Sequence, residues 1–205
     1  MALVKLNNRG VRSATAFGSI TGLGEMRFIK KQTASSSSTI DFVDGTSDVV
    51  LDNTYKEYLF TFNNIHPSGN DIAFQVQFNA AGGSGFNETI TSTAFDAYHA
   101  ESDSGTPNIR YVTGSDQAQG TSYQNLINCT NGNDESAAGY LHLFNPSSTT
   151  FVKHFIARSC STQQSYANEL NAAGYINTTS AIDEVSFKMA SGDIDAGDIC
   201  LYGIN

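Results

Sequence analysis

Short segments in which apolar and polar residues alternate run through most of this chain. Every second residue from Ile72 to Phe78 is apolar, and Glu57–Phe62 repeats the pattern with Tyr58, Phe60 and Phe62. A period of two places alternate side chains on opposite faces of an extended strand. The pattern therefore predicts β-strands with one buried face, and it limits the chain to folds built from such strands.

Further apolar segments are separated by polar turns. Asn145-Pro146-Ser147-Ser148 is typical turn chemistry and predicts a hairpin or corner between two of them. The spacing predicts about eight to ten short strands, which is typical of a two-sheet sandwich. The additional strands are expected at Arg27–Lys31, Ser38–Val43, Ile90–His99, Ile109–Thr113, Tyr140–Phe144, Phe151–Ala157, Ile182–Met189 and Ile194–Ile204.

Composition favours the same class. Ser, Thr, Asn and Gly make up 78 of 205 residues, and these types cost helix stability. The only helical candidates are short, Ser122–Ile127 and Ser165–Ala172. We therefore expect an all-β, jelly-roll-like antiparallel β-sandwich. Its expected core is Phe60, Phe62, Phe74, Val76, Phe78, Leu141, Leu143, Phe155, Val185, Phe187 and Leu201.

The beginning of the chain differs from the rest. Residues 1–25 show neither a strand nor a helix period, and the Ser35–Ser38 run is typical of a flexible link. We expect residues 1–37 to form an extended N-terminal arm with its linker, and residues 38–205 to form the sandwich domain.

Charge is distributed unevenly. The net charge of −9 argues against general nucleic-acid binding. Residues 1–31 hold six basic side chains and one acidic one, which suggests an arm that docks on an acidic partner; a solvated tail without a role is the alternative. The candidate docking residues are Lys5, Arg9, Arg12, Arg27, Lys30 and Lys31.

Cysteine usage and hydropathy add to this picture. The three cysteines are widely spaced, which fits folding in a reducing cytoplasm, and Cys200 is expected to be a small buried apolar residue. No apolar run reaches the roughly 18 residues of a transmembrane helix, and no secretory signal is visible. We expect no membrane association.

Motifs for catalysis and cofactors are weak. His142 and His154 could face each other across the predicted hairpin, but no GxSxG elbow and no closely spaced histidine pair accompanies them. Asp193, Asp195 and Asp198 form a weak calcium candidate, and an ordinary Asp- and Gly-containing turn is the favoured interpretation. We expect no enzyme activity, no cofactor and no metal.

Four segments resemble a known family. They are MALVKLNN (1–8) and the stretches 40–67, 139–158 and 182–205. They resemble small structural proteins of virions of tailed bacteriophages, especially phages of marine bacteria. Asp198 and Cys200 depart from that family's final strand, where a neutral and a charged residue are expected.

The resemblance implies a non-enzymatic β-sandwich subunit made in the host bacterial cytoplasm and located in the virion. As a decoration, fibre or knob protein it would attach to capsid or tail proteins through its arm. Homo-oligomers, such as trimers, would build affinity from weak contacts. The alternative is a module that binds carbohydrate or a receptor on the host surface, with a cleft of Tyr, Asn and Asp where loops 79–89 or 114–138 gather. The absence of Trp weakens that alternative, although nine Tyr could substitute.

Overall fold

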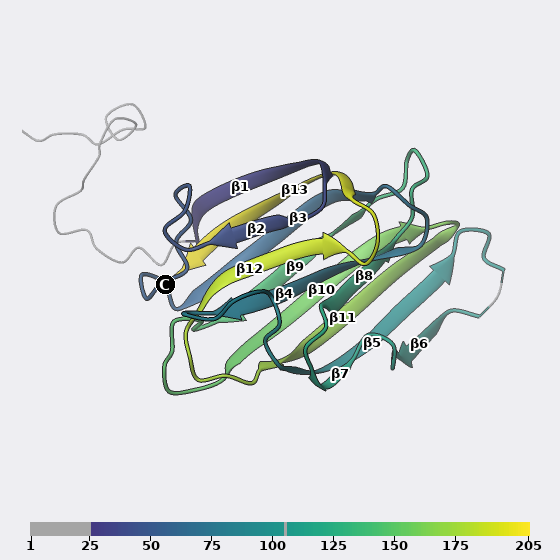
Figure 1. Cartoon of the computed structure of the whole chain (residues 1–205). Helices are drawn as coiled ribbons and strands as arrows, with labels where there is room; N and C mark the ends of the chain where they lie inside the picture. The colour runs from purple at the N-terminus through teal and green to yellow at the C-terminus, as the bar shows by residue number, and fades with distance from the viewer. Residues whose placement is uncertain (1–25, 105) are drawn as a thin grey trace, which may run out of the picture.

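The computed structural model describes residues 26–104 and 106–205, and all of the regular structure there is β-strand (Figure 1). These ranges contain no helix, and so none able to cross a membrane. The strands in chain order are β1 (Met26–Ser37), β2 (Ile40–Val43), β3 (Glu57–Pro67), β4 (Ile72–Ala80), β5 (Ile90–Ala100), β6 (Asn108–Tyr111), β7 (Gln117–Gly120), β8 (Gln124–Cys129), β9 (Ala137–Phe144), β10 (Lys153–Gln163), β11 (Tyr166–Ile176), β12 (Ile182–Met189) and β13 (Ile194–Ile204).

The strands form two antiparallel sheets of unequal size. The larger sheet has nine strands in the order β1-β13-β3-β9-β10-β11-β5-β6, with β7 also paired to β5. The smaller has four, in the order β2-β12-β4-β8, and it lies in front of the larger sheet in Figure 1. The expected all-β antiparallel sandwich is confirmed. Because the sheets differ in size, the smaller sheet covers only part of the larger one.

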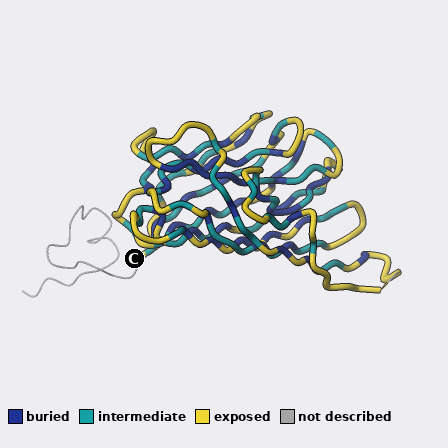
Figure 2. Tube along the Cα trace, turned by 60° about the horizontal axis from the view of Figure 1, so that its bottom comes forward, coloured by how far each residue is buried: buried dark blue, intermediate teal, exposed yellow. Residues whose placement is uncertain are grey.

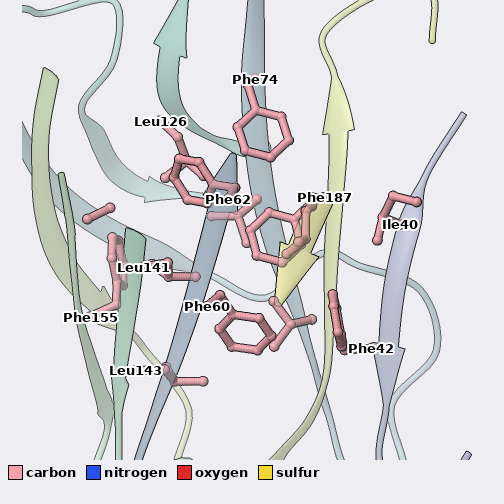
Figure 3. Packing of buried hydrophobic residues seen from close by; sticks show 14 of the residues in the cluster. Ile40, Phe42, Phe60, Phe62, Phe74, Leu126, Leu141, Leu143, Phe155 and Phe187 are labelled. Carbon is pink, nitrogen blue, oxygen red and sulfur yellow. The ribbon is translucent and has the colours of Figure 1, made fainter. Parts of the chain in front are cut away.

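Aromatic side chains fill the space between the sheets. Phe187 of β12 stacks on Phe74 of β4, with ring centroids 5.7 Å apart, and lies 5.4 Å from Phe60 of β3. Phe42 and Phe62 extend this contact, each edge-on to a neighbouring Phe ring (Figure 3). All eleven residues expected in the core are buried, so the alternation pattern identified the inner faces correctly.

Two buried polar side chains hold loops against the sandwich. The Gln77 Nε2 atom lies within 3.1 Å of the carbonyl oxygens of Glu88, Thr121 and Ser122. Lys153 is fully buried and donates its ammonium protons to the carbonyl oxygens of Thr178 and Ser180. Buried polar groups are tolerated when such partners satisfy them.

Two of the expected helices are strands. Residues 124–127 of the Ser122–Ile127 candidate belong to β8, and residues 166–172 of the Ser165–Ala172 candidate belong to β11. β11 is hydrogen-bonded on both sides, to β10 and to β5, along its whole length. Pairing with two neighbours satisfies every backbone group of such a segment, and this outweighs its weak local preference.

The boundary between arm and sandwich also lies elsewhere than expected. Residues 26–37 form β1, which pairs with β13 from Met26↔Ile204 to Ser37↔Ile194, so Ser35–Ser37 are sheet residues rather than a flexible link. A free sheet edge offers hydrogen-bond partners to any extended segment, including a serine run. Residues 1–25 lie outside the described residues.

Truncation of the central ring tests this packing. We expect Phe187→Ala to lower the free energy of unfolding by about 3–5 kcal/mol, because it removes the ring that contacts Phe42, Phe60 and Phe74. Urea unfolding followed by far-UV circular dichroism measures the change. Phe151→Ala is the matched control, since Phe151 is 70% exposed. Equal losses in the two variants would contradict the central role of Phe187.

Candidate functional site

The outward-facing side of the nine-stranded sheet, here called the outer face, has an unusual surface. Among the described residues nine large hydrophobic side chains are exposed, and the strand registers place seven of them on this face. The alternation of buried and exposed residues along the strands is visible in Figure 2. The seven are Met26, Phe28, Phe95, Ile109, Tyr111, Tyr140 and Ile156.

A shallow groove of about 1060 Å³ crosses one end of the outer face. One row of paired residues across five strands lines it, namely Ala138, Cys160, Glu169, Ala97 and Ile109. Three of these five side chains are small, so the sheet surface is depressed between the larger groups on either side. Such an apolar, open depression is suited to contact with another protein surface.

Charged groups on the outer face are paired with one another. Arg158 donates two hydrogen bonds to the Glu169 carboxylate, at 2.7 and 3.0 Å, and these hold the pKa of Glu169 below its usual value. Lys31 and Thr33 do the same for Asp198, at 3.2 and 2.5 Å. The outer face is therefore close to neutral. The described residues as a whole hold eight basic and 19 acidic side chains, a net charge of −11.

The two histidines considered as a catalytic or metal-binding pair, His142 and His154, contact different residues. His142 Nε2 lies 2.8 Å from Glu57 Oε2, and the ring stacks on Phe144. His154 packs edge-on against Tyr175. Both histidines lie on the outer face, but no group of three or more metal-ligating side chains occurs among the described residues.

The three aspartates of the calcium candidate also have different surroundings. Asp195 accepts a hydrogen bond from Ser36 Oγ and lies 3.5 Å from His66, whereas Asp198 is bound by Lys31 and Thr33. Asp193 joins its turn through its backbone, which pairs with Ser68. Asp195 and Asp198 lie on β13, and the described structure does not bring the three carboxylates together.

The candidate docking residues are divided. Lys31 lies on the outer face. Arg27 and Lys30 pair with Gly203 and Leu201, which places them on the opposite face of the sheet. These three therefore do not form one basic patch. Lys5, Arg9 and Arg12 lie outside the described residues.

The loops expected to form a cleft meet only in part. Loops 79–89 and 114–123 come together at Gln77, and residues 114–125 line a hollow of about 380 Å³. The hollow contains Tyr123 and Asn125, as expected for a sugar site. However, Tyr123 is the one aromatic residue among the described residues that line this hollow, and the Lys188 ammonium covers a face of its ring, 4.3 Å from the centroid.

Comparisons with family models, curated proteins and solved structures return no match for the chain.

The three thiols are free and differ in environment. Cys160 is exposed on the outer face, and Cys129 is fully buried. Cys200, expected to be buried, is only partly so, because it occupies an outward position on β13 between buried Ile199 and Leu201. Burial raises the pKa of the Cys129 thiol to about 12.

This shift predicts a loss of stability at alkaline pH. The unfolded thiol loses its proton near the ordinary value of 9.0, while the folded thiol keeps it until about 12. Above pH 9.0 the unfolded state therefore binds fewer protons, and the free energy of unfolding falls as pH rises. We expect Cys129→Ala to show a shallower fall in urea midpoint over this range. Identical slopes for both proteins would contradict the assignment.

Proposed function

We propose that this chain is a non-catalytic structural subunit of a tailed-phage particle, which assembles with copies of itself through the outer face and attaches to capsid or tail through its N-terminal segment. The resemblance of four segments to virion proteins supports the proposed location in a phage particle. The observation that carries the assembly is the gathering of seven of nine exposed large hydrophobic side chains on one sheet face. The seven lie on β1, β5, β6, β9 and β10, so they are spread over the outer face from one edge of the sheet to the other, and exposed apolar groups in this number on one face favour contact with another protein surface.

Charge favours a second copy as the occupant of the outer face. A net charge of −11 over the described residues makes two copies repel at most orientations. On the outer face this repulsion is reduced, because Arg158 with Glu169 and Lys31 with Asp198 neutralise each other within the chain, and Glu57 beside His142 adds one carboxylate. An apolar and nearly neutral face is therefore where two copies can approach, and its burial would stabilise the pair.

The N-terminal segment joins the sheet beside this face. β1 begins at Met26, and Met26 and Phe28 both belong to the outer face. Phe28 packs edge-on against Tyr202, with ring centroids 5.7 Å apart. A segment carrying Lys5, Arg9 and Arg12 is thus connected to the edge of the proposed interface. There it can reach an acidic neighbouring subunit, where its positive charge is favourable.

A charge placed on the outer face tests the assembly. Ile156 is 47% exposed at the middle of this face, so Ile156→Asp should cause little loss of fold stability. Buried in an interface, the new carboxylate would lack a partner, and we expect the oligomer to dissociate at least about tenfold more readily. Sedimentation velocity over a concentration series measures this.

Phe151→Asp is the matched control, because Phe151 is exposed in the β9–β10 loop, away from the seven residues. Labelling of Cys160 with a maleimide adds a second readout, since this thiol should be protected in the oligomer and become reactive in Ile156→Asp. A wild-type monomer at all concentrations, or equal effects of the two aspartates, would refute assembly through the outer face.

Removal of residues 1–25 tests attachment. We expect a chain of residues 26–205 to keep its circular dichroism spectrum and melting temperature but to lose binding to phage particles that lack the native copy. Co-sedimentation with such particles measures attachment. Binding of the full chain should weaken with added salt, because screening reduces the contribution of the basic side chains. Unaltered attachment of residues 26–205 would exclude the segment as the anchor.

A further inference from the structure

A second hollow, of about 290 Å³, is lined by residues that the strand registers place on the side of the large sheet opposite to the outer face, and Tyr98, Tyr166 and Asn168 also line the groove described above. Tyr98 of β5 pairs with Asn168 of β11. Two positions along, the buried residues Asp96 and Leu170 pair in the same way, so all four side chains lie on the inner side of the sheet. In Figure 1 the smaller sheet leaves β5 and β6 without a strand in front of them. The lining comprises Asp71, Tyr98, Arg110, Gln163, Gln164, Tyr166 and Asn168.

Two tyrosines give the hollow its apolar surfaces. The rings of Tyr98 and Tyr166 lie 6.2 Å apart at an angle of 72°, and Tyr166 is 43% exposed. The Arg110 guanidinium covers Tyr98 at 5.0 Å from the ring centroid, whereas Tyr166 is the more open ring. An exposed tyrosine offers a flat apolar face with a polar tip, which suits ligands that carry both C–H and hydroxyl groups.

The polar groups of the hollow are held in place by one another. Asp71 Oδ1 accepts hydrogen bonds from Gln163 Nε2 at 2.8 Å and from Asn128 Nδ2 at 3.1 Å. Asn168 donates to Gln163 at 3.1 Å, and its Oδ1 has no hydrogen-bond partner among the described residues. Arg110 is fixed by two-pronged hydrogen bonds to the buried Asp96. Fixed donors and acceptors reduce the entropy lost when a ligand binds.

We propose that this hollow binds one neutral pyranose ring of a glycan. Amide and carboxylate groups beside an open aromatic ring match a ligand with hydroxyls on its edge and C–H groups on its face. The volume of about 290 Å³ suits a single ring rather than a longer chain within the hollow. Asp71 and Asp96 outnumber Arg110, so an anionic sugar is disfavoured. The hollow shares Tyr98, Tyr166 and Asn168 with the outer-face groove, so sedimentation velocity of Tyr166→Ala shows whether a loss of sugar binding is distinct from a loss of self-association.

Saturation-transfer NMR on the full chain tests the proposal. The probes are the methyl glycosides of glucose, galactose, mannose and N-acetylglucosamine at millimolar concentration, with methyl glucuronide as the anionic comparison. We expect at least one neutral glycoside to receive saturation from the protein, and Tyr166→Ala to weaken its binding by about tenfold. Asp71→Asn should weaken it as well; Asp71 has a φ of 54°, which Asn also adopts readily, so the turn is retained.

Phe151→Ala serves as the control, because Phe151 is exposed next to the opposite end of β10 from Gln163, and its removal should leave binding unchanged. Melting temperatures of the variants show whether a loss of binding reflects a loss of fold. The proposal is overturned if no neutral glycoside gives a signal, if methyl glucuronide alone binds, or if the two hollow variants bind as the wild type does.

Discussion

The phenylalanine layer between the two sheets is the contact on which the rest of the structure depends. The sheets share no ladder of backbone hydrogen bonds, so side-chain packing joins them. Phe187 is central to that packing, because it touches Phe60 of the larger sheet and also Phe42 and Phe74 of its own sheet. Close-packed rings remove apolar area from water and gain dispersion energy with each neighbour. The positions of all surface features follow from this sheet-on-sheet contact.

The unequal sizes of the sheets produce two surfaces of different chemistry. Nine strands cannot be covered by four, and in Figure 1 no strand of the smaller sheet lies in front of β5 and β6, although inward residues of β5 such as Ala94 and Asp96 are buried. Aromatic and amide side chains around Tyr166 occupy that opening, and the proposed sugar site lies there. The outer face has no covering layer among the described residues, and it carries apolar groups around neutral ion pairs. The face proposed for assembly and the hollow proposed for a sugar thus lie on opposite sides of the large sheet and meet at Tyr98, Tyr166 and Asn168.

Much of the fold could be predicted because alternation is a local property. The segments around Phe60 and Phe74 showed which side chains would be buried before any pairing was known. Segments with few apolar residues were misjudged, as in β8, β11 and the end of β1. In these segments the strand conformation comes from hydrogen bonding to neighbours that are distant in the sequence, and local propensity carries little of that information. The proposed interface and sugar site were missed for the same reason.

The class of structure and the division between buried and exposed side chains follow from the order of residues alone, because both depend on the spacing of apolar residues along the chain. Which residues become neighbours is set by the folded arrangement of the strands. The row Ala138, Cys160, Glu169, Ala97 and Ile109 joins five strands, and Asp71 meets Gln163 across 92 positions. Such contacts depend on strand order and register, which are fixed by packing of the whole sandwich rather than by any one segment.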